Sequence, residues 1–108
     1  TDKTIKPFYF YQIPIFLASS GHVKYVEQRF GFDVFHDLID HNYDNEPDNR
    51  KRFLMVIDQI KRLHSDKNHV INFYKENKAR LFKNREIAKR LKESTCDMDY
   101  IFGLINKK

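Results

Sequence analysis

The feature that most constrains the fold of this chain is a pair of short, mainly apolar runs set between helical patterns. The runs cover residues 13–18 and 32–35, and each is shorter than an ordinary helix. Between them, residues 22–30 place apolar side chains at helical spacing and end at Gly31, which is typical of a helix C-terminus. A further helical pattern covers residues 2–12. The alternation of helix and strand predicts an α/β domain with a parallel, partial Rossmann-like sheet.

After residue 36 the sequence predicts a mainly helical second half. Apolar residues recur at helical spacing, and polar caps stand before the two longest patterns: Asp48 or Asn49 before the first and Asp66 before the second. We expect a polar loop over residues 42–49 and a break over residues 94–99. The predicted helices of this half occupy residues 37–41, 50–64, 67–92 and 100–105.

Two strands are too few for a parallel sheet that stands by itself. We therefore expect partner strands from a missing N-terminal domain of a longer protein, or from a second copy of the chain. Residues 1–108 then form a single domain or fragment, with an α/β segment over 1–49 and a helical segment over 50–108.

The two halves differ in charge. Residues 1–49 carry four Lys or Arg against eight Asp or Glu, whereas residues 50–108 carry sixteen against seven. A basic half indicates an anionic partner such as nucleic acid. It equally indicates the solvated face of a long helix, because acidic residues are interleaved with the basic ones.

Two alternatives for function follow from the basic half. One is a nucleic-acid-binding module that uses the helix over residues 67–92, and the other is a small interaction protein whose basic half docks a partner. The candidate nucleic-acid contacts are Lys83, Arg85, Lys89 and Arg90.

Composition narrows the class of protein. No apolar run approaches the roughly 18–20 residues that a membrane span needs. The single Cys96 rules out an intrachain disulfide framework and favours a cytoplasmic location. The five histidines lack the spacing of a zinc motif, so we predict no metal site.

The opening stretch resembles the signature segment in the donor-binding half of GT-B-type glycosyltransferases, especially the α1,3-fucosyltransferase-like family. Thr1-Asp2-Lys3 stands at the family's T-E-K position, and Ile13-Pro14-Ile15-Phe16 follows after the same interval without a gap. The continuation is similar to a phage and viral glycosyltransferase-like subgroup. It comprises residues 21–26, 31–35 and 39–44, with Arg52 near the start of the next helix.

The resemblance implies a nucleotide-sugar donor as the ligand, with Asp2 and Lys3 in contact with it; no other cofactor is identified. A helix start bearing a Lys suits a diphosphate. Ser19, Ser20 and Gly21 would follow the first strand, where ligands of open α/β sheets bind. The acceptor-binding half that carries the family's catalytic base is absent. We therefore expect a donor-binding fragment that is not catalytic alone, with its catalytic residues unknown, in a host cytoplasm if phage-encoded.

Overall fold

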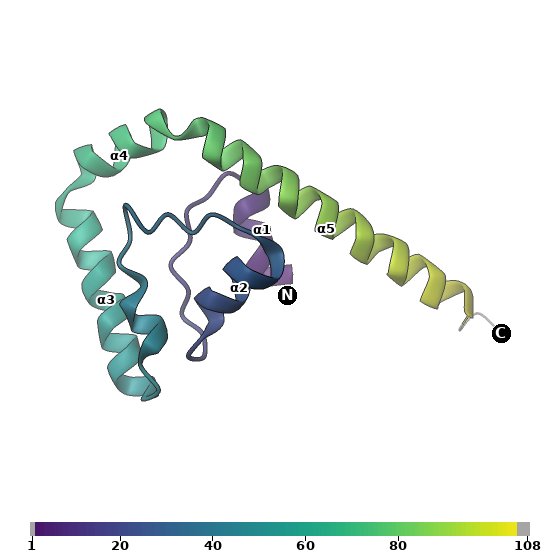
Figure 1. Cartoon of the computed structure of the whole chain (residues 1–108), viewed down its shortest axis with the longest axis horizontal. Coiled ribbons are helices and arrows are strands. Elements are labelled where there is room, and N and C mark those ends of the chain that lie inside the picture. Colours follow the sequence, from purple (N-terminus) through teal and green to yellow (C-terminus); the bar gives the residue numbers. More distant parts are fainter. Residues whose placement is uncertain (1, 106–108) are drawn as a thin grey trace.

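The computed structural model describes the backbone of residues 2–105 and the side chains of residues 4–93. In this part of the chain, five α-helices and one 3-10 helix follow one another (Figure 1). They are α1 Asp2–Tyr9, α2 His22–Phe30, η1 His41–Asn45, α3 Asn49–Ser65, α4 Lys67–Glu76 and α5 Lys78–Ile105.

The helices form an arc around the N-terminal half of the chain. α3, α4 and the first part of α5 follow one another along this arc, with α1, α2 and the extended segments inside it (Figure 1). α1 packs on α5, while η1 lies between α2 and α3 and contacts both. The second half of α5 projects beyond the other helices, which accounts for a longest dimension of 55 Å.

The predicted α/β, Rossmann-like fold is wrong. Residues 13–18 and 32–35 lie outside the helices, but the described part of the chain contains no strand and no sheet. The GT-B architecture, which consists of two such domains, is therefore absent from these residues as well.

Side chains bond several of the backbone groups that a neighbouring strand would have bonded. Asn84 of α5 accepts from the N–H of Asp33 at 2.9 Å and donates to its carbonyl at 2.7 Å. His41 Nε2 lies 2.7 Å from the carbonyl oxygen of Val34. In the first run, the N–H of Phe16 donates to the hydroxyl of Tyr43 at 3.1 Å. Buried backbone groups need partners, and here helical and loop side chains supply them.

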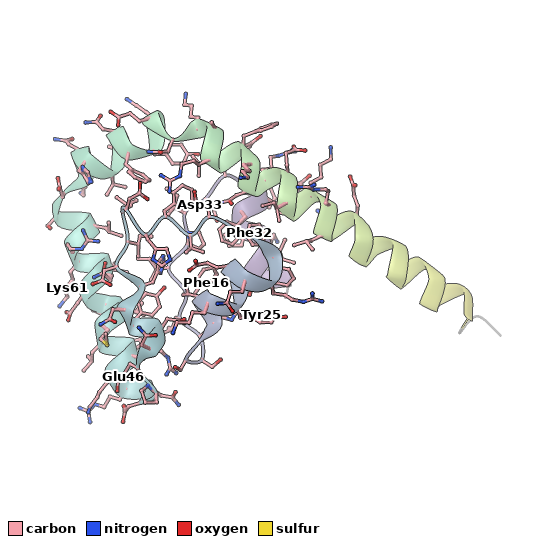
Figure 2. All side chains as sticks on the ribbon, viewed as in Figure 1. Phe16, Tyr25, Phe32, Asp33, Glu46 and Lys61 are labelled. Atoms are coloured by element: carbon pink, nitrogen blue, oxygen red, sulfur yellow. The ribbon has the colours of Figure 1, made fainter. Side chains whose placement is uncertain are left out.

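The second apolar run is nevertheless buried, with Phe32, Val34 and Phe35 in the core, whereas in the first run only Phe16 is buried and Leu17 is 62% exposed. Phe16 and Phe32 lie inside the arc of helices (Figure 2), in the larger of two core clusters. That cluster contains Phe8, Phe16, Val23, Val26, Phe32, Val34, Tyr43, Val56 and Ala88. The second cluster lies toward α4 and contains Phe35, Leu38, Ile39, Phe73 and Leu81.

Two helix boundaries follow the local signals in the sequence. α2 ends where predicted, at Gly31, which has φ of 77° and donates its N–H to the carbonyl of Glu27. This left-handed conformation favours glycine because a Cβ would be strained there. α3 begins after Asp48, whose carboxylate accepts from the N–H of Lys51 at 2.9 Å.

Other predicted boundaries are wrong. The helix expected over residues 67–92 is divided at Asn77, whose side-chain amide donates to the carbonyl of Phe73 at 2.8 Å and so ends α4. α5 continues through residues 94–99, where we predicted a break. The brief helix expected over residues 37–41 is absent, because residues 36–38 form a turn. The 3-10 helix η1 begins at His41 and extends into the loop that we predicted over residues 42–49.

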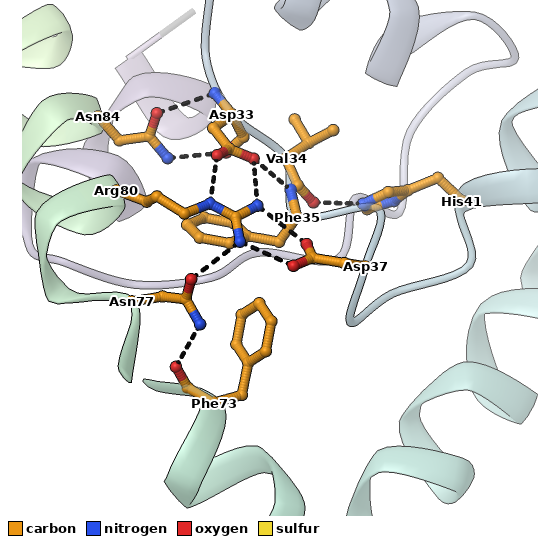
Figure 3. A network of polar contacts seen from close by, with 9 residues as sticks. All are labelled: Asp33, Val34, Phe35, Asp37, His41, Phe73, Asn77, Arg80 and Asn84. Carbon is orange, nitrogen blue, oxygen red and sulfur yellow. Dashed lines mark hydrogen bonds and ion pairs between the residues drawn. The ribbon is translucent and has the colours of Figure 1, made fainter. Parts of the chain in front are cut away.

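Arg80 of α5 joins the long helix to the extended segment. Its guanidinium donates to both carboxylate oxygens of Asp33, at 2.7 and 3.0 Å, and to both of Asp37, at 2.8 and 2.9 Å (Figure 3). The guanidinium carbon also lies 4.7 Å from the ring centroid of Phe35 and 5.6 Å from that of Phe73. Bidentate pairing combined with stacking is specific to arginine.

The charges of this cluster are mutually stabilised. Partial burial opposes ionisation of Asp33, but hydrogen bonds from Arg80 and from the N–H of Phe35 outweigh it and hold the carboxyl pKa below 3.8. Hydrogen bonds from Arg80 likewise lower the pKa of Asp37. The same two carboxylates raise the pKa of Arg80. All three groups are therefore charged at neutral pH.

We predict that Arg80→Ala lowers the free energy of unfolding by about 2 kcal/mol, because two partly exposed carboxylates lose their charge-assisted hydrogen bonds. Arg80→Lys should recover less than half of this loss, since an ammonium lacks the planar fork. Urea unfolding followed by circular dichroism measures both. The matched control is Lys83→Ala, an exposed residue of the same helix, and equal stability of Arg80→Ala and Lys83→Ala would contradict the role of Arg80.

Candidate functional site

One side-chain contact joins the first turn of α1 to the start of α2, and each of these two places adjoins predicted donor-binding residues. Thr4 Oγ1 lies 3.3 Å from His22 Nε2, which joins the first turn of α1 to the first residue of α2. Ser19, Ser20 and Gly21 directly precede that residue. The backbone of Asp2 and Lys3 lies in the same first turn of α1, whereas their side chains are outside the described residues.

Asp44 of η1 clamps the segment before α2. Its carbonyl oxygen accepts from Ser20 Oγ and from the N–H of Gly21, both at 2.9 Å. Its carboxylate accepts from the N–H of Val23 at 2.9 Å and from that of Lys24 at 3.1 Å. Asp44 is buried, with 4% of its surface exposed. The chain turns sharply into α2 at Gly21, where φ is 84°, a conformation that favours glycine.

This clamp changes the expected role of the α2 N-terminus. We expected Ser19, Ser20 and Gly21, after the first apolar run, to lie at the donor site. The N–H groups of Gly21, Val23 and Lys24 are instead bonded within the chain, and the carboxylate of Asp44 already compensates the positive end of the helix. A phosphate would therefore not bind to these N–H groups of α2.

A polar cleft of about 320 Å³ adjoins the same end of α2. Side chains of α2, of η1 and of the loop between them line it, and the ring nitrogen Nε2 of His36 lies 2.7 Å from Glu27 Oε1. Carboxylates and amides outnumber cations here, so the cleft suits a hydroxyl-rich ligand better than an anion. Its polar lining includes Lys24, Glu27, His36, Asp40, Asn42 and Asn45.

A buried chain of hydrogen bonds lies beneath the cleft. Tyr43 Oη lies 2.8 Å from His41 Nδ1, and His41 Nε2 lies 2.7 Å from the carbonyl oxygen of Val34. A carbonyl only accepts, so Nε2 carries the proton and Nδ1 accepts from the tyrosine hydroxyl. Burial lowers the pKa of His41 and raises the pKa of Tyr43 to about 12. Both side chains are neutral near pH 7 and have a structural role.

The predicted nucleic-acid contacts do not form one group. At about 100° per residue, Arg85 and Lys89 lie within about 40° of each other around α5, whereas Lys83 and Arg90 lie about a third of a turn or more away. Only Arg85 packs on the N-terminal segment, with its guanidinium carbon 4.9 Å from the ring centroid of Tyr9 and 5.6 Å from that of Tyr11.

A second depression, which the sequence analysis missed, lies beside α4 and α5. It measures about 310 Å³ and is lined mainly by apolar and aromatic side chains. The sequence signal that could have indicated this depression is the four-residue spacing of Tyr74, Lys78 and Phe82. The break between α4 and α5 at Asn77 interrupts this spacing. The lining residues are Tyr11, Tyr74, Lys78, Leu81 and Phe82.

Two other kinds of feature, a cluster of metal ligands and a membrane-spanning helix, are absent from the described residues. They contain no group of three or more His, Cys, Asp or Glu side chains that could hold a metal ion. No helix among them is long and apolar enough to cross a membrane.

The Asp44 clamp predicts a measurable capping energy. Asp44→Ala should lower the free energy of unfolding by about 2 kcal/mol, because two N–H groups at the start of α2 lose their acceptor. Asp44→Asn should cost about half as much, since one amide oxygen remains as an acceptor. Thermal and urea unfolding test this, with the exposed Asp58→Ala as the control; a loss no larger than that of the control would refute the clamp.

His41 predicts a pH dependence of stability. Its pKa is below 6.5 in the folded chain and about 6.5 in the unfolded chain, so the unfolded state binds more protons in that interval. The free energy of unfolding should therefore be constant above about pH 6.5 and fall as the pH decreases below it. Urea midpoints between pH 7.5 and 5 measure the effect.

The control for this prediction separates His41 from the other histidines. His41→Gln should remove most of the decline below pH 6.5, whereas His69→Gln, at an exposed position of α4, should leave it unchanged. An undiminished decline in His41→Gln would assign the pH dependence to another group.

Comparisons of the chain with protein-family models, with curated proteins and with solved structures found no match.

Proposed function

We propose that this chain provides the nucleotide-sugar-binding side of a glycosyltransferase-like protein, with the donor bound where α1 meets α2. The hydrogen bond between Thr4 and His22 carries this proposal. It joins the turn that holds Asp2 and Lys3 to the residue that directly follows Ser19, Ser20 and Gly21, across 18 positions of sequence. The sequence resemblance assigns Asp2 and Lys3 to the donor.

Helix polarity assigns the diphosphate to the start of α1. The first N–H groups of a helix attract anions, and Lys3, which the resemblance assigns to the donor, belongs to this turn. α2 does not offer an equivalent site, because Asp44 bonds its first N–H groups. Ser19, which is exposed, and Ser20 flank the junction and supply hydroxyl groups.

The polar cleft is the place for the sugar ring. It begins at the first turn of α2, beside His22, and its amide and carboxylate groups are those that bind sugar hydroxyls. Asp40, Asn42 and Asn45 contribute such groups from η1 and the residue before it. The proposed role is donor binding; transfer to an acceptor would require residues outside this chain.

Isothermal titration calorimetry of the full chain with GDP and UDP as probes tests the donor site. We expect binding of at least one nucleoside diphosphate, and an affinity at least tenfold lower in Lys3→Ala, because a charge-assisted contact to phosphate is lost. Lys67→Ala is the matched control, since Lys67 is an exposed lysine at the start of α4. Absence of binding at millimolar concentrations, or equal loss in both variants, would overturn the proposal.

A further inference from the structure

One face of α4 and α5 carries aromatic and basic side chains in alternation. Lys78, Phe82, Arg85 and Lys89 recur every three or four residues, so they lie along one side of α5. Tyr74 of α4 lines the same depression as Lys78 and Phe82. Tyr74 and Phe82 are 39% and 54% exposed. Large aromatic side chains at such exposure need a reason, because a helix facing only water would carry polar residues there.

The N-terminal segment adds another ring beside this face. Tyr11 follows shortly after α1 and is 38% exposed. Tyr11 has φ of 60°, an uncommon value for a residue with a large side chain. Tyr11 lines the second depression together with Tyr74, Lys78 and Phe82, so the exposed rings converge on one place.

The depression suits a flat aromatic group. Leu81, 1% exposed, forms its floor, and its rim consists of rings and one ammonium group. Its volume of about 310 Å³ is at the lower end of the range for small-molecule sites, which is enough for a nucleobase.

The cations continue from the depression toward the C-terminal part of α5. Arg85 stacks on Tyr9 and Tyr11, and Lys92 Nζ lies 4.7 Å from the ring centroid of Tyr9. The nearest acid, Glu86, is 3.4 Å from Arg85 and lies beside the row. The row therefore combines positive charge with exposed ring faces over several turns.

We propose that this basic–aromatic surface, formed by Tyr11, Tyr74, Lys78, Phe82, Arg85 and Lys89, binds single-stranded nucleic acid. Unpaired bases stack on the exposed rings, and the cations between the rings bind the phosphates. A duplex would use only the cations, because its bases are stacked within the helix. A protein partner fits less well, since the cores of protein interfaces are depleted in lysine. The surface shares no residue with the proposed donor site, so the two proposals succeed or fail separately.

Fluorescence anisotropy with a labelled twelve-nucleotide deoxythymidine strand tests the inference on the full chain. We expect binding at 50 mM salt, with about tenfold weaker affinity in Phe82→Ala and unchanged affinity in Phe82→Tyr, which keeps the ring. Lys78→Ala should reduce the slope of log K against log salt by about 0.7, which corresponds to one lost phosphate contact. A duplex of the same length should bind at least tenfold more weakly than the single strand.

Phe53→Ala on α3 is the matched control, because Phe53 is 45% exposed and lies on another helix. Circular dichroism establishes that each variant is folded; if Phe82→Ala is not, Tyr74→Ala takes its place with the same expected loss. Three results would overturn the inference: no binding of the strand, equal affinity for strand and duplex, or equal effects of the ring-removing variant and Phe53→Ala.

Discussion

The pairing of Arg80 with Asp33 and Asp37 is the interaction on which the rest of the described structure depends. It attaches the extended segment after α2 to the long helix, across 47 and 43 positions of sequence. Phe35 lies midway between these two acids in the sequence. It is fully buried and has φ of 59°, an unfavourable conformation for a phenylalanine. The ion pairs on either side and the stacked guanidinium hold this residue in place, and its ring begins the second core cluster.

The same region shows how a chain can bury extended segments without a sheet. Asn84 hydrogen-bonds both the N–H and the carbonyl of Asp33, and His41 hydrogen-bonds the carbonyl of Val34. Arg52, buried on α3, donates to the carbonyls of Ala18 and Glu46 and also bonds Asn49. Polar side chains on helices thus replace the hydrogen bonds of a neighbouring strand, and the described part leaves no buried side-chain nitrogen or oxygen atom without a partner.

This arrangement places two different surfaces on one small molecule. The junction of α1, α2 and η1 is polar and is held by Asp44, whereas the face of α4 and α5 is basic and aromatic. The hydroxyl-binding groups of the first surface suit a sugar, and the rings and cations of the second suit unpaired bases and phosphates. Both depend on the position of α1, since α1 contributes Thr4 to the junction and its end leads to Tyr11 on the basic–aromatic surface.

The sequence by itself determined the helices whose ends are marked by local residues, and the burial of the apolar residues of 32–35. Gly31 ends α2 and Asp48 begins α3 through hydrogen bonds to residues no more than four positions away. Such boundaries can be predicted from the local sequence. Only the tertiary structure decided how the buried backbone is bonded and which exposed rings share a surface. A strand and a buried extended segment have the same apolar pattern, and they differ in partners such as Asn84 that lie tens of residues away.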